Sequence, residues 1–325
     1  MHETGIFNIV LTAADLMALM ACIGLLTCCI WVLPAAGRNT NCSTTDLSAS
    51  IWKLLGACIA ALTASSIGIL LWRALDMSGQ PFSELASVLP VVLQETHFGK
   101  TWWLRPLALA LLWFGWWNGR GLNSRALAVS MWGACALIAL SRSLSGHAAD
   151  GGDFTLPELS DWVHLLAGSV WAGGLLVFTL AAFQALAESA GAGRRFMVEI
   201  VRRFSSLASI ALAAVLVTGI CNTWIELGAL AAFWETAYGR ILLVKLLLVL
   251  MLVVMGASNR YRSIPLLRDW AMKEGTGNGD PSQQFVRKVL IQEILMLAVI
   301  FCVAFLVNAV PGHHLAHASH SAHQQ

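Results

Sequence analysis

Eight long apolar segments follow one another along the chain and are separated by short polar connections. Each is a continuous apolar run without strict alternation of apolar and polar residues, so the pattern predicts helices and not the strands of a membrane barrel. A helix crosses a bilayer with about 20 mostly apolar residues, and the third segment reaches that length only if it begins near Gly99. The eight segments span residues 7–33, 51–75, 103–117, 126–145, 162–186, 204–227, 241–258 and 289–310.

The composition identifies these helices as membrane spans. Hydrophobic residues make up 58% of the 325 residues, charged residues make up 12%, and the mean hydropathy is +0.71. A soluble chain has about a quarter charged residues, so the polar surface is too small for a soluble enzyme. The net charge of +2 is too small to indicate a nucleic-acid partner. The sequence therefore predicts an all-α membrane protein with eight transmembrane helices in a lipid bilayer. The first segment is too long for a signal peptide and is interpreted as a retained helix.

Lysine and arginine gather in every second connection between the predicted spans, whereas the alternate connections are acidic or mixed. Connections rich in Lys and Arg face the cytoplasm, so both termini are predicted to be periplasmic. With this topology all nine histidines lie on the outer side, although random placement would scatter them over both faces. The basic connections hold Arg38 and Lys53; Arg120 and Arg125; Arg194, Arg195, Arg202 and Arg203; and Arg260, Arg262, Arg268, Lys273, Arg287 and Lys288.

Two similar segments indicate an internal repeat. Residues 95–105 and 235–245 both contain Glu-Thr-x-aromatic-Gly-basic, followed five positions later by a second basic residue, Arg105 or Lys245. The pattern predicts two four-helix repeats in parallel orientation, at residues 1–145 and 146–310, followed by a tail at 311–325. The alternative is that two helix starts acquired the same capping chemistry independently.

Three basic residues are predicted to lie near or inside the outer half of the bilayer. Arg105 and Lys245 would sit roughly one to two helical turns inside the membrane. A buried charge there is usually functional or paired, and the alternative is that each side chain extends back to the outer headgroups. Arg142, near the outer end of the fourth segment, could pair with the outer carboxylates.

Three histidines form the candidate metal site. His147 ends the fourth predicted span, His164 begins the fifth and His97 precedes the third. A short acidic connection brings His147 and His164 close together, and His97 joins them only if the third span packs nearby. Imidazole is a good ligand for copper, zinc or nickel, and Asp161, one turn before His164, could orient its ring. The alternatives are solvated surface histidines and, for His164, a hydrogen-bonded packing residue.

The C-terminal segment is a second candidate metal-binding region. His313, His314 and His317 lie in it, and His320 and His323 continue a spacing of three residues. Histidine-rich tracts bind metals by composition. We interpret the tail as an arm outside the membrane that collects metal, with an inert polar tail as the alternative.

Sulfur-containing residues follow the first two predicted spans. Thiolates and thioethers suit Cu(I), so a route through the membrane can be drawn from the outer imidazoles, over two methionines, to cysteines toward the cytoplasm. The alternative is that these side chains are apolar fillers. The residues are Met17, Met20, Cys22, Cys28, Cys29 and Cys58, with Cys42 in the connection between the spans.

The order of several short motifs resembles the CopD copper-resistance family of bacterial inner-membrane proteins. The motifs are Ser-Gly-His147, His164 with Trp171-Ala-Gly-Gly174, Arg203-Phe-Ser with Thr218-Gly219 and Trp224, and Thr236-x-Tyr-Gly-Arg240 followed by Lys245 and Asn259-Arg260. The resemblance implies an eight-helix permease that brings copper across the inner membrane. It also implies a periplasm-facing copper site at His147 and His164, and a separate periplasmic copper carrier of the CopC type as partner.

The leading hypothesis is therefore a copper transport protein and not an enzyme. It takes copper from the periplasm toward the cytoplasm through a histidine site at the outer mouth, and contributes to copper homeostasis or resistance. Two alternatives remain: a b-type haem or quinone oxidoreductase, since helical bundles can ligate haem through histidine, and a periplasm-facing metal sensor without flux.

Overall fold

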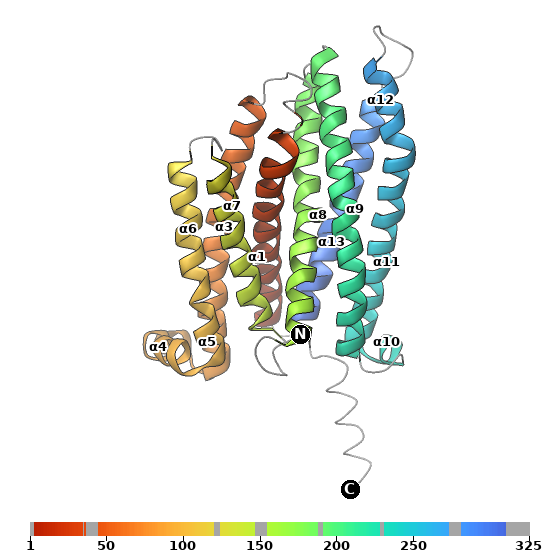
Figure 1. Cartoon of the computed structure of the whole chain (residues 1–325). Coiled ribbons are helices and arrows are strands. Elements are labelled where there is room, and N and C mark those ends of the chain that lie inside the picture. The colour runs from red at the N-terminus through yellow and green to blue at the C-terminus, as the bar shows by residue number, and fades with distance from the viewer. Residues whose placement is uncertain are drawn as a thin grey trace.

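The computed structural model describes residues 3–34, 36, 45–119, 124–146, 155–187, 191–227, 231–272 and 281–309. Every regular element in these ranges is helical, and the long helices stand side by side in one bundle (Figure 1). The elements are α1 (Glu3–Thr27), η1 (Cys28–Val32), α3 (Thr45–Ser78), η2 (Phe82–Glu84), α4 (Leu85–Glu95), α5 (His97–Trp102), α6 (Leu104–Asn118), α7 (Arg125–Ser143), α8 (Leu156–Ala187), α9 (Gly191–Leu227), α10 (Ala232–Glu235), α11 (Ala237–Ser258), η4 (Asn259–Ser263), α12 (Ile264–Met272) and α13 (Pro281–Val307).

Within the described residues, seven helices are long and apolar enough to cross a membrane. They correspond to all the predicted spans except the third. That segment forms α6, which has 15 residues and follows the short helix α5 after a break at Trp103. The all-helical membrane fold is confirmed, whereas the count of eight crossings stays a prediction.

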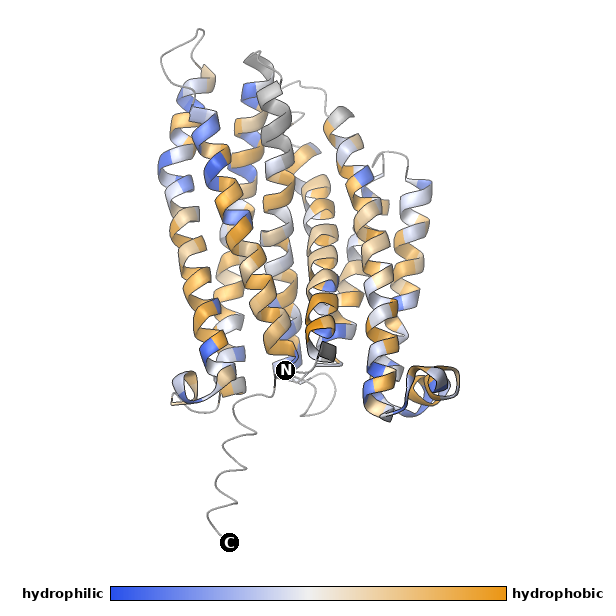
Figure 2. Cartoon of the chain, turned by 180° about the vertical axis from the view of Figure 1, so that it is seen from behind, coloured by the Kyte–Doolittle hydropathy of each residue, from blue (hydrophilic) through white to orange (hydrophobic). Residues whose placement is uncertain are grey.

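The lateral surface of the bundle is apolar, as a protein dissolved in lipid requires. Figure 2 shows apolar residues along the middle of the helices and more polar residues near their ends. Large side chains such as Ile210, Ile220 and Leu247 are mostly exposed on α9 and α11. These side chains face lipid. The hydrocarbon of the bilayer keeps them away from water, so they do not need to be buried inside the bundle.

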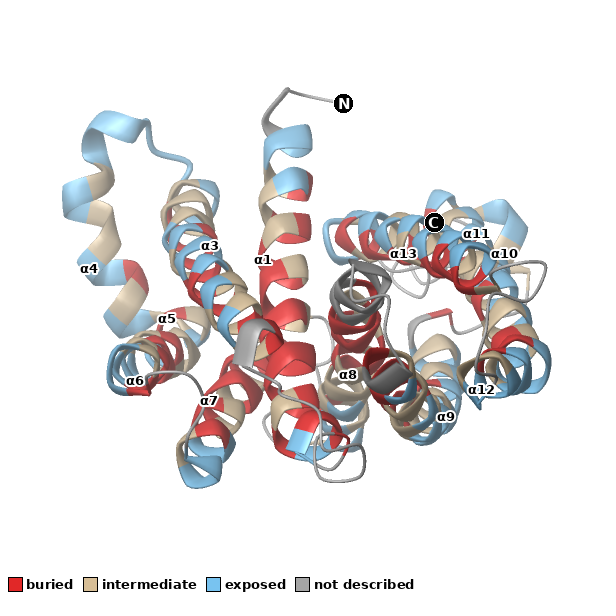
Figure 3. Ribbon diagram, turned by 90° about the horizontal axis from the view of Figure 1, so that it is seen from above, coloured by how far each residue is buried: buried red, intermediate tan, exposed pale blue. Residues whose placement is uncertain are grey.

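Helices α1 and α8 form the centre of the bundle (Figure 3). Helix α1 packs against α3 and α7 on one side and against α8 and α13 on the other. Helix α8 packs against α9 and α13, and also against α1 and α7. Helix α6 packs against α7, and α11 packs against α13 in the same manner. The neighbours of α1 thus correspond in part to those of α8, which fits a repeat, and the repeat itself stays a prediction.

Glycines bring the backbones of α1 and α8 into direct contact. A Cβ atom added to Gly24 would lie 2.1 Å from the carbonyl carbon of Gly173, and one added to Gly173 would lie 2.0 Å from the carbonyl oxygen of Met20. Small residues allow membrane helices to approach this closely. Gly24 and Gly173 are therefore close-packing positions.

The two similar sequence segments have the same local geometry. Thr96 caps α5 by accepting a hydrogen bond from the Gly99 amide at 3.0 Å, and Thr236 caps α11 by accepting one from the Gly239 amide at 2.9 Å. A Cβ atom on either glycine would collide with the carbonyl oxygen of the preceding short helix, at 2.1 Å and 2.0 Å. The glycines therefore permit the same sharp fold-back in both halves. This geometry fits a repeat and also fits independent capping, so the division at residues 145 and 146 stays a prediction.

Candidate functional site

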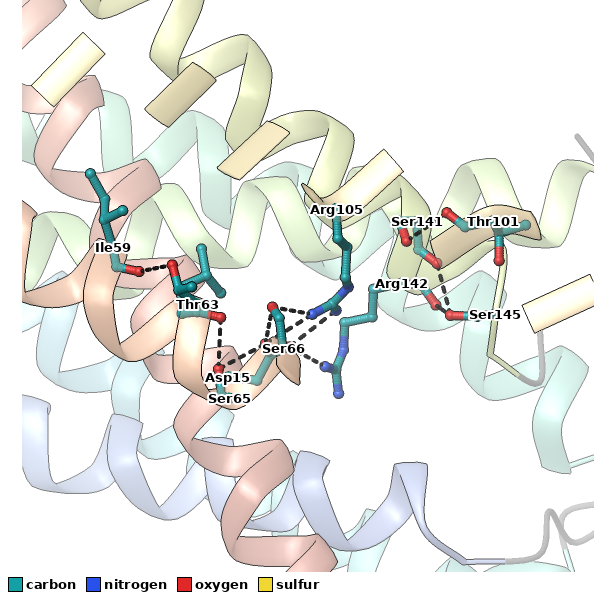
Figure 4. Close-up of polar contacts among 11 residues, drawn as sticks. Asp15, Ile59, Thr63, Ser65, Ser66, Thr101, Arg105, Ser141, Arg142 and Ser145 are labelled. Carbon is teal, nitrogen blue, oxygen red and sulfur yellow. Dashed lines mark hydrogen bonds and ion pairs between the residues drawn. The ribbon is translucent and has the colours of Figure 1, made fainter. Parts of the chain in front are cut away.

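A buried carboxylate in α1 binds two arginines from the neighbouring helices α6 and α7 (Figure 4). Asp15 is fully buried and accepts hydrogen bonds from Arg105 at 3.0 and 3.2 Å and from Arg142 at 2.8 Å. Ser65 donates to the same carboxylate at 3.1 Å, and Ser66 accepts from Arg105 at 2.9 Å. We call these five residues the Asp15 layer.

The Asp15 layer contains two cations and one anion, so it holds a surplus positive charge inside the bundle. Ionisable groups within a membrane are costly, and they normally face the interior in pairs. The structure resolves the two interpretations of Arg105, because its guanidinium is paired and does not extend to the headgroups. Arg142 also pairs, with Asp15 directly and with the outer carboxylate of Asp161 through electrostatic attraction.

Sequence reasoning missed Asp15, although a signal was available. Between Glu3 and Arg38 it is the single charged residue, set within a long apolar run. An isolated ionisable residue in a predicted span is a functional-site hypothesis by default. This rule identifies Asp15 from the sequence alone, whereas the helices that supply its partners are known only from the structure.

His164 on α8 forms a second polar group, with Thr218 on α9. Nδ1 of His164 lies 2.9 Å from the Thr218 hydroxyl oxygen, and that hydroxyl donates to the Ala214 carbonyl at 2.6 Å. Because the hydroxyl hydrogen is used, the hydroxyl oxygen accepts from the Nδ1–H group. The neutral ring then carries its lone pair on Nε2, which is the nitrogen that can bind a metal.

The expectation that Asp161 orients the His164 ring is wrong, because Thr218 supplies that contact. Asp161 instead interacts electrostatically with Arg142 and Lys245. Lys245 also interacts electrostatically with His164. One helical turn separates Asp161 from His164 on α8, but the carboxylate is directed to the basic residues.

The His164 group lies where the repeat would place a copy of the Asp15 layer. Asp15 and His164 each precede a crossing glycine, Gly24 or Gly173, by nine residues. Arg105 and Lys245 each follow a capping threonine by nine residues, and Ser66 and Thr218 each precede a tryptophan, Trp72 or Trp224, by six. At these positions Asp15 and Arg105 form an ion pair, whereas the matching residues His164 and Lys245 place an imidazole beside an ammonium group.

His97 lies at the start of α5 and reaches the end of α7. Its Nε2 donates a hydrogen bond to the Leu144 carbonyl at 3.0 Å. Nearby at the start of α8, Glu158 is 2% exposed, and its Oε1 has no hydrogen-bond partner among the described residues. The Ser143 hydroxyl donates to the Glu158 carbonyl at 2.8 Å. The structure thus gathers polar groups of α5, α7 and α8 at one end of the bundle.

The other predicted ligands lie outside the described residues. These are His147, His313, His314 and His317. Within the described part of the chain, no group of three or more His, Cys, Asp or Glu side chains is placed to hold a metal ion. His97 bonds the Leu144 carbonyl at the end of α7, whereas His164 bonds Thr218 on α9. The three-histidine site therefore stays a prediction.

Fold and site together define a multi-pass helical membrane protein with charged and imidazole groups buried between its helices. Family comparison agrees in detail: residues 198–306 match "Copper resistance protein D", and residues 1–154 match "Copper resistance protein D-like, N-terminal domain". The chain belongs to the CopD copper-resistance family and is a multi-pass protein of the inner membrane.

Two curated relatives support this assignment. The "Copper transport protein CutJ" of Bacillus subtilis (strain 168) is 33% identical over 118 residues, which is 36% of this chain and 21% of CutJ. This chain thus matches only about a fifth of CutJ's length. The "Inner membrane protein YebZ" of Escherichia coli (strain K12) is 28% identical over 228 residues, covering 68% of this chain and 70% of YebZ. No solved structure matches the chain significantly.

Proposed function

We propose that this protein transports copper across the inner membrane, from the periplasm toward the cytoplasm. The observation that carries the proposal is His164, whose ring is oriented by Thr218 so that Nε2 can bind a metal, in a chain of a copper-resistance family. His97 and His147 supply further imidazoles at the periplasmic mouth. The tail histidines His313, His314 and His317 collect copper, and a separate carrier of the CopC type delivers it.

The charges around His164 have to be balanced for a cation to bind there. Lys245 would repel copper, whereas Asp161 attracts both Lys245 and Arg142. The Asp161 carboxylate thus offsets the ammonium charge that faces His164. In this proposal, the transport of copper contributes to copper homeostasis or resistance.

For topology, we propose eight crossings with α5 and α6 together forming the third, and both termini in the periplasm. Asn8 near the start of α1 donates a hydrogen bond to Asn308 after α13 at 2.6 Å, so the first and last helices end at the same face of the bundle. Two ends on one face need an even number of crossings. Seven long helices and the crossing formed by α5 and α6 give eight crossings. The basic connections then face the cytoplasm.

Reporter fusions test this topology. We expect alkaline phosphatase fused after Gln325 to be active, because that enzyme folds only in the periplasm. Green fluorescent protein inserted within residues 273–280 should fluoresce, because this basic connection is cytoplasmic. An inactive C-terminal phosphatase together with a fluorescent C-terminal fusion would contradict the proposal.

Substitution of His164 tests the transport proposal. We expect His164→Ala to reduce cellular copper accumulation, measured by mass spectrometry, to the level of cells that lack the protein. Thr218→Val keeps the imidazole but removes the contact that orients it, and such losses lower metal affinity about 10–100-fold. It should therefore raise the external copper concentration needed for half-maximal uptake.

His2→Ala is the matched control, since it removes a histidine outside the proposed site. It should leave uptake unchanged at equal membrane abundance. Wild-type accumulation in the His164→Ala strain would overturn the transport site. Proteoliposomes that bind copper without accumulating it would instead favour the sensor hypothesis.

A further inference from the structure

Two helical turns from the Asp15 layer, three of the four helices that form it, α1, α3 and α7, carry cysteines at matching positions. Cys22 lies seven residues after Asp15 on α1. Cys58 lies seven residues before Ser65 on α3, and Cys135 lies seven residues before Arg142 on α7. Seven residues are two helical turns, a rise of about 10.5 Å on the same helix face. Helix α1 runs antiparallel to α3 and α7 in the bundle (Figure 1), so all three steps lead in one direction.

The hydrogen bonds of the Asp15 layer therefore set the register of the cysteines. Asp15 contacts Ser65 at 3.1 Å and Arg142 at 2.8 Å, so these positions of the three helices are in register. Two turns further on, Cys22 and Cys135 belong to one buried cluster, and Cys58 packs against it. We call Cys22, Cys58 and Cys135 the thiol layer. Cys22 and Cys58 belong to the sulfur route predicted from the sequence, whereas Cys135 lies outside it.

The thiol layer is enclosed within the bundle. Cys22 and Cys135 have 0% exposure, and Cys58 is partly buried. All three thiols are free. Thiolate is the ligand type that selects Cu(I), and Cu(I) is stable with only two thiolate ligands. A pair centred on Cys22 is therefore sufficient, and no group of three or more ligands is needed.

We propose that the thiol layer is a Cu(I) site inside the membrane, formed by Cys22 with Cys58 or Cys135. Cu(I) replaces the protons of two thiols, the two protons are released, and copper keeps its charge of +1 because no electron is transferred. The neutral dithiol thus becomes a bis-thiolate copper centre with one negative charge. The surplus positive charge of the Asp15 layer, two turns away, stabilises that centre.

This inference deepens the proposed function and rests on it for the delivery of copper from the periplasmic mouth. The thiol layer lies two turns beyond the Asp15 layer along α1, away from the end at which Asn8 and Asn308 meet. In the proposed topology that direction leads toward the cytoplasm. In this proposal copper enters at the histidines already as Cu(I), so no reductant is needed on its way to the thiols.

Titration of the purified full-length protein tests the site. The reduced protein in detergent is titrated with Cu(I) under anaerobic conditions against bicinchoninate as competing chelator. We expect Cys22→Ala to lower Cu(I) affinity at least 100-fold, and X-ray absorption of the wild-type complex to show a sulfur-only shell. Wild-type affinity in Cys22→Ala, or a shell of nitrogen and oxygen, would overturn the proposal.

Matched controls separate ligand loss from damage to the fold. Cys302→Ala removes a partly buried thiol of α13 and should retain wild-type affinity. Cys58→Ala and Cys135→Ala each leave one thiol pair with Cys22, so each should lower affinity less than Cys22→Ala does. Equal losses in all four variants would overturn the assignment. Thermal melting of each variant shows whether it is folded.

The test is independent of the transport proposal. His164→Ala should keep the sulfur-bound Cu(I) in the purified protein even if it abolishes uptake in cells. If His164→Ala takes up copper normally, the histidine path fails, but the titration still decides the thiol site. If Cys22→Ala binds Cu(I) normally, the thiol site fails, and the uptake measurements with His164→Ala stand.

Discussion

Asp15→Asn is expected to destabilise the protein by about 3–5 kcal/mol, because it leaves two buried arginines without their counter-charge. Asp15 is fully buried and bonds both Arg105 and Arg142. The amide of asparagine can accept a hydrogen bond, but it carries no charge to offset the guanidinium groups. Thermal unfolding of the purified variant in detergent measures the loss, together with the amount of folded protein in the membrane.

Glu199→Gln is the matched control for this substitution. Glu199 is 14% exposed and also binds two arginines, but these, Arg202 and Arg203, are 58% and 30% exposed, so water can solvate them when the carboxylate charge is removed. Exposed ion pairs contribute about 0–1 kcal/mol, so the control should melt close to the wild type. Equal stability of Asp15→Asn and the wild type would show that the buried charges are not paired as described.

A triple substitution separates the structural role of the Asp15 layer from a functional one. Replacing a whole buried ion cluster by apolar residues is often neutral or stabilising by about 1–4 kcal/mol. We therefore expect Asp15→Leu combined with Arg105→Met and Arg142→Met to fold. We also expect it to lose copper uptake, because the charge that stabilises the thiol layer is gone. Wild-type uptake by a folded triple variant would contradict this role.

Gly173→Ala is expected to separate the two central helices and to cost about 3 kcal/mol, at the upper end of the usual effect of overpacking. The added Cβ atom would lie 2.0 Å from the Met20 carbonyl oxygen and 2.8 Å from the Gly24 Cα. Both are backbone atoms, so rotation of a side chain cannot relieve the collision. The helices would have to move apart along much of their shared interface.

Gly168→Ala, on the same helix, is the control for Gly173→Ala. A Cβ atom at Gly168 meets nothing within 4 Å, so the change should be neutral or stabilising by up to about 1 kcal/mol through helix propensity. Thermal melting of the two variants measures the difference. If both variants melt together, α1 and α8 are not in backbone contact at Gly173.

The candidate site was only partly predictable from the sequence. His164, Arg105 and Arg142 were identified because charged or imidazole groups stand out on apolar helices. Their partners could not be identified from the sequence. A contact between side chains on two helices depends on how each helix is rotated about its axis and on their register along it. Thr218 is an ordinary residue in the sequence, and its role follows solely from its 2.9 Å contact with His164.

By itself the sequence determined that the protein is a bundle of membrane helices, where its longest spans lie, and the family to which it belongs. Lipid offers no hydrogen bonds to the backbone, so long apolar runs leave little choice except helices. Only the tertiary structure decided that Asp15 joins two arginines and that Cys22, Cys58 and Cys135 share one layer. Those contacts join helices far apart in the chain, and hydropathy does not encode which face of a helix meets which neighbour.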